Sequence, residues 1–378
     1  MHPLSGIRVL DLADQSGALA GKLLAGLGAD VVLVERTEAG NRLTGAGPAA
    51  IWNRGKRSIA IDLKSERGAE TVLRLVDGAD ALIEGMRPGV MERLGLGPDV
   101  CHARNPRLVY GRMTGWGQSG PLAQAAGHDN NYIALSGALW YASAPGDPPI
   151  APPTLIGDLG GGALYLAVGL LGGLLQARAT GRGTVVDAAI VDGSAHLMNL
   201  LLALKAAGQM SSTRGQSLLD GPHWFATYRC ADGKFITVGS LEPQFYAVLL
   251  QRLGLQEDPA FADGYDPRRW PELKQRFADL FATRPCAEWC SLLEGSDACF
   301  APVLTPEEAA QHPHNVAREI FSVRDGMLQA NPAPRFAGFE NRAPGRVPRR
   351  GEHTDDLLRA AGCSAAEIVA LRAEGIIG

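Results

Sequence analysis

The sequence has no strongly basic block, no paired-cysteine motif and no internal repeat. Its 36 Lys and Arg residues are set against 40 Asp and Glu residues, and the net charge of −4 argues against a nucleic-acid-binding scaffold. The six cysteines are scattered, with no Cys-x-x-Cys pair and no histidine at zinc-binding spacing, so we expect no metal site. Such cysteines are typical of reduced thiols, and we expect a cytoplasmic protein.

Signals for secretion and membrane insertion are also missing, with one partial exception. The opening "MHPLSGIRVLDLAD" does not place a charged region before an apolar stretch, as a secretion signal would. The uncharged run Leu159–Ala177 is long enough to cross a membrane. It is rich in glycine and no second such run accompanies it, so we expect no membrane partner and a helix buried on all sides within a large domain.

Short apolar runs alternate with helical patterns through the first part of the chain. Helices are predicted at 20–28 and 66–76, and strands are predicted at 7–13, 29–35, 58–64, 81–85 and 107–115. A further strand followed by a helix is predicted within 183–209. Strands that alternate with helices predict an α/β fold with a Rossmann-like parallel sheet.

The length of 378 residues is too great for one ordinary core, so we expect two domains. A large α/β domain is expected over 1–189, completed by 333–378, and a smaller α+β domain over 224–312. The polar run "MSSTRGQ" indicates a linker within 190–223, and Pro-rich stretches indicate a return linker over 313–332. In the small domain, β-rich runs flank Asp232-Gly233, which predicts a hairpin, and helical spacing follows.

Strand, turn and helix at the start of the chain suggest a dinucleotide site, but the turn has no G-x-G-x-x-G fingerprint. Parallel α/β sheets bind ligands beyond the carboxyl ends of their strands. Basic residues cluster near predicted strand ends, and guanidinium groups match phosphates, so a polyanionic ligand is a reasonable hypothesis. Solvated surface charge is the alternative for these residues, which are Arg36, Arg54, Lys56, Arg57, Lys64, Arg87 and Arg93.

Three residues are candidates for acid–base chemistry. His128 lies in "AGHDNNY" (126–132), where a capping loop is the plainer interpretation. Asp158 lies in "GDLGGG" (157–162), where it is either a helix cap or a group beside amides that stabilise negative charge. Glu242 in "LEPQFY" has the position of a helix-starting acid before Pro243.

Five motifs, taken together in order, resemble those of the α-methylacyl-CoA racemases, members of the family III CoA transferase superfamily. They are "GRMTGWGQSGP", "AGHDNNYIALSG", "GDLGGG", "VVDAAIVDG" and "LEPQFY". The resemblance extends from "PLSGIRVLDL" to "PAPRF" at 332–336. It implies that His128 and Asp158 are the two bases and that Glu242 pairs with Asp158.

The same resemblance implies an acyl-CoA substrate, no separate cofactor and a role in lipid metabolism. It implies an interlocked homodimer in which the large domain of one chain and the small domain of the other build each site. The expected CoA contacts are Arg36, Ile61, Asp62, Leu63, Lys64, Gly85, Met86, Arg87, Arg93, Gly127, Asp129, Asn130, Asn131 and Tyr132.

Inversion of the carbon beside a thioester requires acid–base groups on its two sides. Histidine suits one role near neutrality, and a close carboxylate such as Glu242 would raise the proton affinity of an aspartate in the other. We expect the amides of "DLGGG", beginning with Asp158, to stabilise the enolate oxygen. A CoA transferase with Asp158 as nucleophile is the alternative, and a non-enzymatic acyl-CoA-binding module is a third hypothesis. His128 favours the racemase, because the transferases do not need that imidazole.

Overall fold

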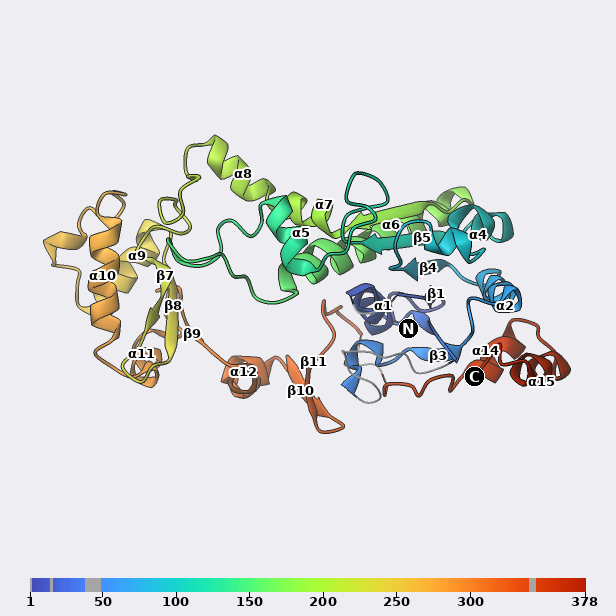
Figure 1. The fold of residues 1–378 in the computed structure, drawn as a ribbon. Coiled ribbons are helices and arrows are strands. Elements are labelled where there is room, and N and C mark those ends of the chain that lie inside the picture. Colours follow the sequence, from blue (N-terminus) through green and yellow to red (C-terminus); the bar gives the residue numbers. More distant parts are fainter. Residues whose placement is uncertain (1, 14–15, 38–48, 340–344) are drawn as a thin grey trace. The chain divides into compact units, whose positions relative to one another are not determined.

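The computed structural model describes residues 2–13, 16–37, 49–339 and 345–378 (Figure 1). It divides into two compact units. Unit 1 comprises Met1–Leu139, Ala151–Leu197 and Glu319–Gly378, and unit 2 comprises Trp140–Ile150 and Met198–Arg318. The division differs from the expected ranges mainly at Trp140–Ile150, which belongs to unit 2 although no boundary was expected there.

Unit 1 contains the parallel sheet that the alternating pattern predicts. All five strand pairings are parallel, and the strand order is β3-β2-β1-β4-β5-β6, the order of a Rossmann fold. The strands are β1 (Arg8–Asp11), β2 (Asp30–Glu35), β3 (Arg57–Ala60), β4 (Ala81–Glu84), β5 (Val109–Thr114) and β6 (Val185–Ala189). The order reverses between β1 and β4, which is where ligands bind in such sheets.

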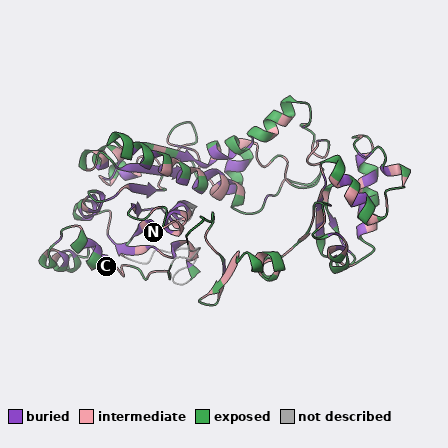
Figure 2. Ribbon diagram, turned by 180° about the vertical axis from the view of Figure 1, so that it is seen from behind, coloured by how far each residue is buried: buried purple, intermediate pink, exposed green. Residues whose placement is uncertain are grey.

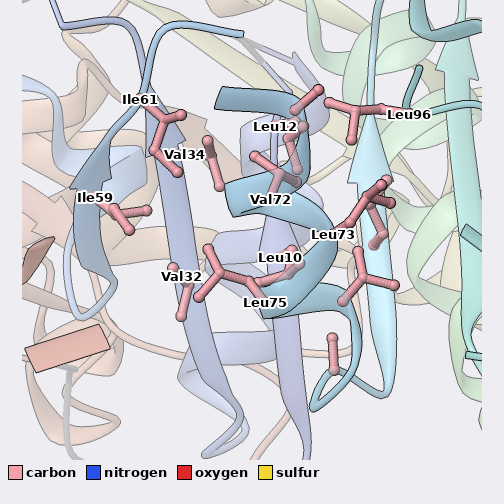
Figure 3. Packing of buried hydrophobic residues seen from close by; sticks show 14 of the residues in the cluster. Leu10, Leu12, Val32, Val34, Ile59, Ile61, Val72, Leu73, Leu75 and Leu96 are labelled. Atoms are coloured by element: carbon pink, nitrogen blue, oxygen red, sulfur yellow. The ribbon is translucent and has the colours of Figure 1, made fainter. Parts of the chain in front are cut away.

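Alternate residues of the strands build two apolar cores, because successive side chains point to opposite faces of a sheet. On one face Leu10, Val32 and Ile59 pack against α2 (Glu66–Val76), as Figure 3 shows. On the other face Val9 and Val31 belong to the core that includes residues of α1 (Ser16–Gly26) and α6 (Leu164–Thr180). The sheet is therefore covered by helices on both faces, and its inner strands β1, β2 and β4, taken together, are mostly apolar.

The remaining elements of unit 1 are short. They are η2 (Ile51–Asn53), α3 (Val90–Arg93), α4 (Pro98–Arg104), α5 (Asp129–Ser136), η3 (Leu155–Ala163), α7 (Ile190–Leu197), β10 (Phe321–Arg324), β11 (Met327–Ala330), α14 (Thr354–Ala360) and α15 (Ala365–Ala373). The hairpin β10–β11 was not predicted, although Asp325-Gly326 at its turn is a recognised hairpin signal.

The prediction that the long apolar helix is buried on all sides is wrong for the single chain. The run Leu155–Thr180 (η3 and α6) is long and apolar enough to cross a membrane, but only 39% of its most apolar window is buried. Leu164, Val168 and Leu175 of α6 are 51%, 68% and 69% exposed. Figure 2 shows exposed residues beside buried ones in the helices that cover the sheet. Helical spacing places these three residues on one stripe, while Leu166, Leu170 and Leu174 pack into the core.

Unit 2 has a three-stranded antiparallel sheet, in the order β7-β8-β9, and a set of helices. The hairpin predicted around Asp232-Gly233 is confirmed by β7 (Phe225–Arg229) and β8 (Phe235–Gly239). The core is rich in aromatic residues, including Trp224, Phe277 and Trp289. The other elements are α8 (Asn199–Ala206), α9 (Pro243–Leu253), η4 (Pro259–Phe261), α10 (Trp270–Phe281), α11 (Cys286–Leu293), β9 (Phe300–Val303), α12 (Pro306–Gln311) and α13 (Pro313–Ala317).

Candidate active site

A pocket of about 250 Å³ lies at the carboxyl ends of the parallel strands in unit 1. Gly85 follows β4, Thr114 ends β5 and Ile190 follows β6, so several strand ends meet there. His128 and Asp158, the two residues expected to act as bases, both line this pocket. Its lining residues are Gly17, Gly85, Met113, Thr114, Gly115, Gly127, His128, Tyr132, Asp158 and Ile190.

His128 is the N-cap residue of α5 and has extended backbone dihedral angles. Its backbone N–H donates to Asn131 Oδ1 at 2.9 Å, so the side chain of Asn131 helps to start the helix. The residue itself is exposed, which leaves its imidazole accessible to a ligand. The capping interpretation of this motif is confirmed by the contact of Asn131 with the backbone, and His128 also lines the pocket.

Asp129 connects the element that carries His128 to the element that carries Asp158. Its carboxylate is buried, and Oδ1 accepts hydrogen bonds from the backbone N–H groups of Gly157 and Asp158 at 2.9 and 2.8 Å. The Oδ2 atom is buried without a hydrogen-bond partner. Asp129 was predicted only as a CoA contact, and the structure gives its side chain an internal structural role.

The prediction that the amides of "DLGGG" stabilise an enolate is wrong for its first two members. The π-helical segment η3 begins at Leu155, so Asp158 lies inside the segment and not at its start, where backbone amides have no partner within the helix. The N–H of Asp158 donates to Asp129, and that of Leu159 donates to the carbonyl of Thr154 at 3.1 Å. Segments of π-helix occur often at functional sites.

The glycines of this motif allow close packing of elements. A Cβ atom on Gly157 would lie 2.5 Å from Asp129 Oδ1, and one on Gly161 would lie 2.5 Å from Ser194 Oγ. A real Cβ atom does not approach its neighbours so closely. Glycine is thus required for α5, η3 and α7 to pack together, and this packing places Asp158 on the wall of the pocket.

Tyr132 closes one side of the pocket. Its hydroxyl donates to the carbonyl of Gly127, and its ring packs edge-on against Trp116 with centroids 4.8 Å apart. A Cβ atom on Gly115 would lie 2.0 Å from Tyr132 Cζ, so glycine is needed beside the ring. Burial and then the charge of Asp158 raise the pKa of Tyr132, which indicates that the phenol and the Asp158 carboxylate are near neighbours.

Four of the residues expected to bind CoA are exposed cations beyond the carboxyl ends of β2, β3 and β4. They are Arg36, Lys64, Arg87 and Arg93. None of the four forms an ion pair with another described residue. Leu63 and Met86 are partly exposed on the same loops, Gly127 is partly exposed, and Asn130 is exposed in the first turn of α5. Unpaired cations at this edge suit a polyanionic ligand.

Two other members of the predicted CoA set shape the loop after β3. Ile61 is fully buried and belongs to a hydrophobic core, so its side chain is not available to a ligand. The side chain of Asp62 accepts from the N–H of Lys64 at 3.1 Å and thereby shapes the turn after β3. These contacts fix the loop that carries Lys64.

A charge network that sequence reasoning missed, with Glu84 and Arg112 buried and Glu92 exposed, supports the loop after β4. Arg112 contacts Glu84 at 2.7 Å and Glu92 at 2.8 Å, and Glu84 also accepts from the N–H of Met86 at 2.7 Å. Burial raises the pKa of Glu84 despite these contacts. The network holds the chain at Gly85–Arg87, where ligand contacts are expected. Its members lie near strand ends in the sequence, but their pairing depends on the tertiary fold.

Three basic residues assigned to the ligand-binding edge have other roles. Arg54, Lys56 and Arg57 precede β3 or begin it, and so lie near its amino end. Lys56 forms a fully buried ion pair with Asp11 at 2.7 Å, and Arg54 pairs with Asp325 at 2.8 Å. Arg57 donates to Asp30 Oδ1 at 2.8 Å. The hypothesis of a phosphate contact is therefore wrong for these residues, whose counter-charges come from the chain itself.

Glu242 lies in unit 2, away in sequence from the other two candidates. It is the N-cap residue of α9, it is exposed, and Pro243 begins the helix behind it. Its charge contributes to a raised pKa of Tyr265, after the effect of burial. Glu242 is therefore presented on the surface of unit 2, while His128 and Asp158 lie together in unit 1.

Among the described residues, no group of three or more His, Cys, Asp or Glu side chains is arranged to hold a metal ion. All six cysteines are unpaired. Asp14 and Gln15, in the loop after the first strand, lie outside the described residues.

The sequence model of CoA-transferase family III matches residues 4–354. The chain belongs to CoA-transferase family III. It is 43% identical over 383 residues to the α-methylacyl-CoA racemase of Mus musculus and 41% identical over 384 residues to that of Homo sapiens. Each match covers 99% of this chain and 97% of the relative.

Transferases and solved structures of the same family are more distant. A probable fatty acyl-CoA transferase of Mycobacterium tuberculosis is 32% identical, over 94% of this chain and 97% of its own. The crystal structure of a CAIB/BAIF family protein from Brucella suis matches with a TM-score of 0.81 at 25% identity, and covers 95% of this chain and 99% of that chain. The α/β architecture with its parallel sheet is therefore that of the family.

Proposed function

We propose that this chain is a racemase that inverts the α-carbon of 2-methyl-branched acyl-CoA thioesters. One observation carries the proposal: an imidazole, His128, and a carboxylate, Asp158, line the same pocket at the ligand-binding edge of the sheet. The chain that holds them is 43% and 41% identical to two α-methylacyl-CoA racemases over nearly its whole length.

The reaction needs a base on each side of the α-carbon. One residue of the pair His128 and Asp158 removes the α-proton, and the other returns a proton to the opposite side. The thioester enolate formed between these steps carries negative charge on oxygen. No separate cofactor is required, since the thioester carbonyl itself accepts the electron pair, and the CoA moiety is part of the substrate.

The first turn of α5 supplies the hydrogen-bond donors for this enolate in our proposal. The first amides of a helix have no partner within the helix. Those of Asp129 and Asn130 follow His128 directly, and neither donates to a backbone acceptor outside the helix among the described residues. Fixed amides at the positive end of a helix stabilise a developing oxyanion without reorganisation.

The phosphates of CoA are bound, we propose, by Arg36, Lys64, Arg87 and Arg93. These exposed cations lie beyond the carboxyl ends of β2, β3 and β4, which flank β1 in the sheet. Glu242 completes the site beside Asp158, and we propose that a second copy of the chain contributes it in an interlocked homodimer. Because the six cysteines are unpaired, we also propose a reducing, cytoplasmic location for an enzyme of lipid metabolism.

A CoA transferase is the second candidate, and the position of Asp158 on the pocket is the observation that favours it. In that reaction the Asp158 carboxylate attacks a thioester and forms a mixed anhydride, which CoA thiolate then converts to an enzyme-bound thioester. His128 has no necessary role in such a sequence.

Deuterium exchange separates the two reactions. The His128→Ala variant should lose racemisation but still exchange the α-proton of one enantiomer of a 2-methylacyl-CoA in heavy water, because the other base remains. The Asp158→Asn variant should exchange only the opposite enantiomer. Each loss of racemisation should be about 10²- to 10⁴-fold, the usual contribution of a positioned base. His314→Ala, at an exposed histidine of unit 2, is the matched control.

A different result would identify the transferase. If hydroxylamine trapped an Asp158 adduct during turnover and His128→Ala kept full activity, the racemase proposal would fail.

A further inference from the structure

A second pocket lies in unit 1 on the outer face of α1, and the proposed reaction does not use it. Its volume is about 230 Å³. Leu19, Lys22, Leu23 and Gly26 form one wall, at the spacing of residues on one side of a helix. The segment Gln329–Ala333, at the end of β11, forms the facing wall. Pro332 lies close to α1, since a Cβ atom on Gly26 would be 3.6 Å from it.

The lining of this pocket combines apolar side chains with the amides Gln329 and Asn331 and with two cations. Lys22 and Arg54 both line it, and Lys56 is near enough to influence the charge of Lys22. The nearby carboxylates are already engaged, because Asp11 pairs with Lys56 and Asp325 pairs with Arg54. Lys22 has no ion pair with any described residue, so no described carboxylate balances its positive charge.

Two buried donors on the walls also lack acceptors. Arg54 is 3% exposed and its Nε has no hydrogen-bond partner. Gln329 is 5% exposed and its Nε2 has none either. A buried donor without an acceptor is energetically unfavourable, so these two groups suit a ligand that brings an acceptor.

We propose that this pocket binds a small organic monocarboxylate, with its alkyl chain against Leu19, Leu23 and Pro332 and its carboxylate toward Lys22. The apolar side chains select against inorganic anions, and the Lys22 ammonium selects against neutral molecules. The volume limits the ligand to a short chain, since pockets for drug-sized molecules measure about 300–1,000 Å³.

The pKa of Lys22 is a further property that a bound anion would change. Burial, followed by the charges of Arg54 and Lys56, lowers the pKa of Lys22 below its usual value. A bound carboxylate would offset both effects, because an opposite charge stabilises the ammonium form. Neither α1 nor the segment 329–333 contributes an acidic group to the pocket, so the compensating charge must come from outside these walls.

Calorimetric titration of the full chain with sodium hexanoate tests the proposal. Hexanoate should bind saturably, and 1-hexanol and inorganic phosphate should each bind at least about tenfold more weakly, a difference of about 1.4 kcal/mol. Lys22→Met keeps the length of the side chain but removes its charge, and it should weaken hexanoate binding by a similar factor. Lys205→Met, at an exposed lysine of unit 2, should leave binding unchanged.

A second variant tests the pocket independently, in case Lys22→Met does not fold. Ala330→Phe adds a ring at the exposed rim of the pocket, and it should also abolish hexanoate binding. The proposal is overturned if hexanoate does not bind, if Lys22→Met binds it as tightly as the unaltered chain, or if Ala330→Phe has no effect. Racemase activity is not the readout, so an active enzyme that ignores hexanoate would leave the proposed function standing.

Discussion

Asp129 shows how one buried residue can position two others. Its Oδ1 atom holds the amides of Gly157 and Asp158, while its backbone follows His128 directly. The relative placement of the two proposed bases therefore depends on one carboxylate oxygen. This dependence makes Asp129 a positioning residue, whose effect on the reaction is transmitted through its neighbours.

Substitutions of Asp129 should show whether it acts as a hydrogen-bond acceptor or through its negative charge. Asp129→Ala leaves two amides without their acceptor, at a cost of about 1–3 kcal/mol, and should lower kcat by about 10- to 100-fold with a smaller change in KM. Asp129→Asn retains an acceptor oxygen and should recover most of that loss. Asp147→Ala, at an exposed carboxylate of unit 2, serves as the control. Equal activity of Asp129→Ala and the unaltered chain would contradict the positioning role.

His223 is a buried histidine with a purely structural environment. It is 0% exposed in the core of unit 2, and its Nε2 lies 2.8 Å from the Tyr246 hydroxyl. Burial, with a smaller effect of Lys274, lowers the pKa of His223 to about 3. The folded state therefore keeps this imidazole neutral at pH values where the unfolded chain binds a proton.

The stability of the chain should consequently fall on acidification because of His223. The neutral His223 makes its full contribution to the free energy of unfolding above its pKa in the unfolded chain, which is about 6.5. Below that pH, the free energy of unfolding declines by about 1.4 kcal/mol per pH unit until the pH reaches the pKa of His223 in the folded state. Urea unfolding at pH 7 and pH 5 measures this slope. His223→Gln should reduce the slope, whereas His314→Gln, at an exposed histidine, should not. Identical slopes in the His223 variant and the unaltered chain would refute the assignment.

At the scale of elements, the segment η3 depends on its contact with α7. A Cβ atom on Gly161 would meet Ser194 Oγ at 2.5 Å and the carbonyl of Ile190 at 2.9 Å, and one on Gly193 would meet the carbonyl of Gly161 at 1.9 Å. The two elements therefore approach with their backbones nearly touching. A larger residue at this contact would have to move η3, and Asp158 with it.

Gly161→Ala should accordingly reduce both stability and activity. Overpacking of a close contact costs about 1–3 kcal/mol, and the displaced Asp158 should lower kcat further. Gly26→Ala is the matched control, because its added methyl would meet only Pro332 at an ordinary distance of 3.6 Å. Thermal unfolding and steady-state kinetics give the two readouts. A fully active and equally stable Gly161→Ala protein would show that η3 tolerates a wider separation from α7.

At the scale of the whole molecule, the apolar stripe of α6 requires an explanation. Leu164, Val168 and Leu175 are more than half exposed on one face of the helix. Leu135 of α5 and Leu155 of η3, both in unit 1, are 62% and 54% exposed as well. Exposed apolar surface of this kind is typical of protein interfaces, and the proposed homodimer would cover it.

A charge on this stripe should prevent assembly. Val168→Glu would bury an unpaired carboxylate in the interface, and we expect a monomer by size-exclusion chromatography with light scattering, together with loss of racemase activity. Val369→Glu is the matched control, since Val369 on α15 is 66% exposed, close to the 68% of Val168. A monomeric unaltered chain, or a Val168→Glu variant that remains dimeric, would remove the stripe from the interface.

Local patterns in the sequence determined much of the fold. The helix predicted over 66–76 coincides with α2, because Ser65 caps it and one face is consistently apolar. The strands of the parallel sheet were also predicted, since the inner strands β1, β2 and β4, taken together, are mostly apolar and mostly buried. The ordered motifs around His128, Asp158 and Glu242 indicate the family from the sequence alone, because these residues stand in short segments of unusual composition.

The tertiary structure alone decided where charges and backbone groups find their partners. Lys56 and Arg54 form ion pairs within the chain and were wrongly predicted as phosphate contacts, because Asp11 and Asp325, distant in the sequence, lie beside them. The amide of Asp158 is occupied because Asp129, 29 residues earlier, packs beneath η3. Hydrophobic periodicity is a property of neighbours along the chain, so a sequence displays it directly. Ion pairs, close glycine contacts and pockets arise between segments far apart in sequence, and they become visible only when the chain has folded.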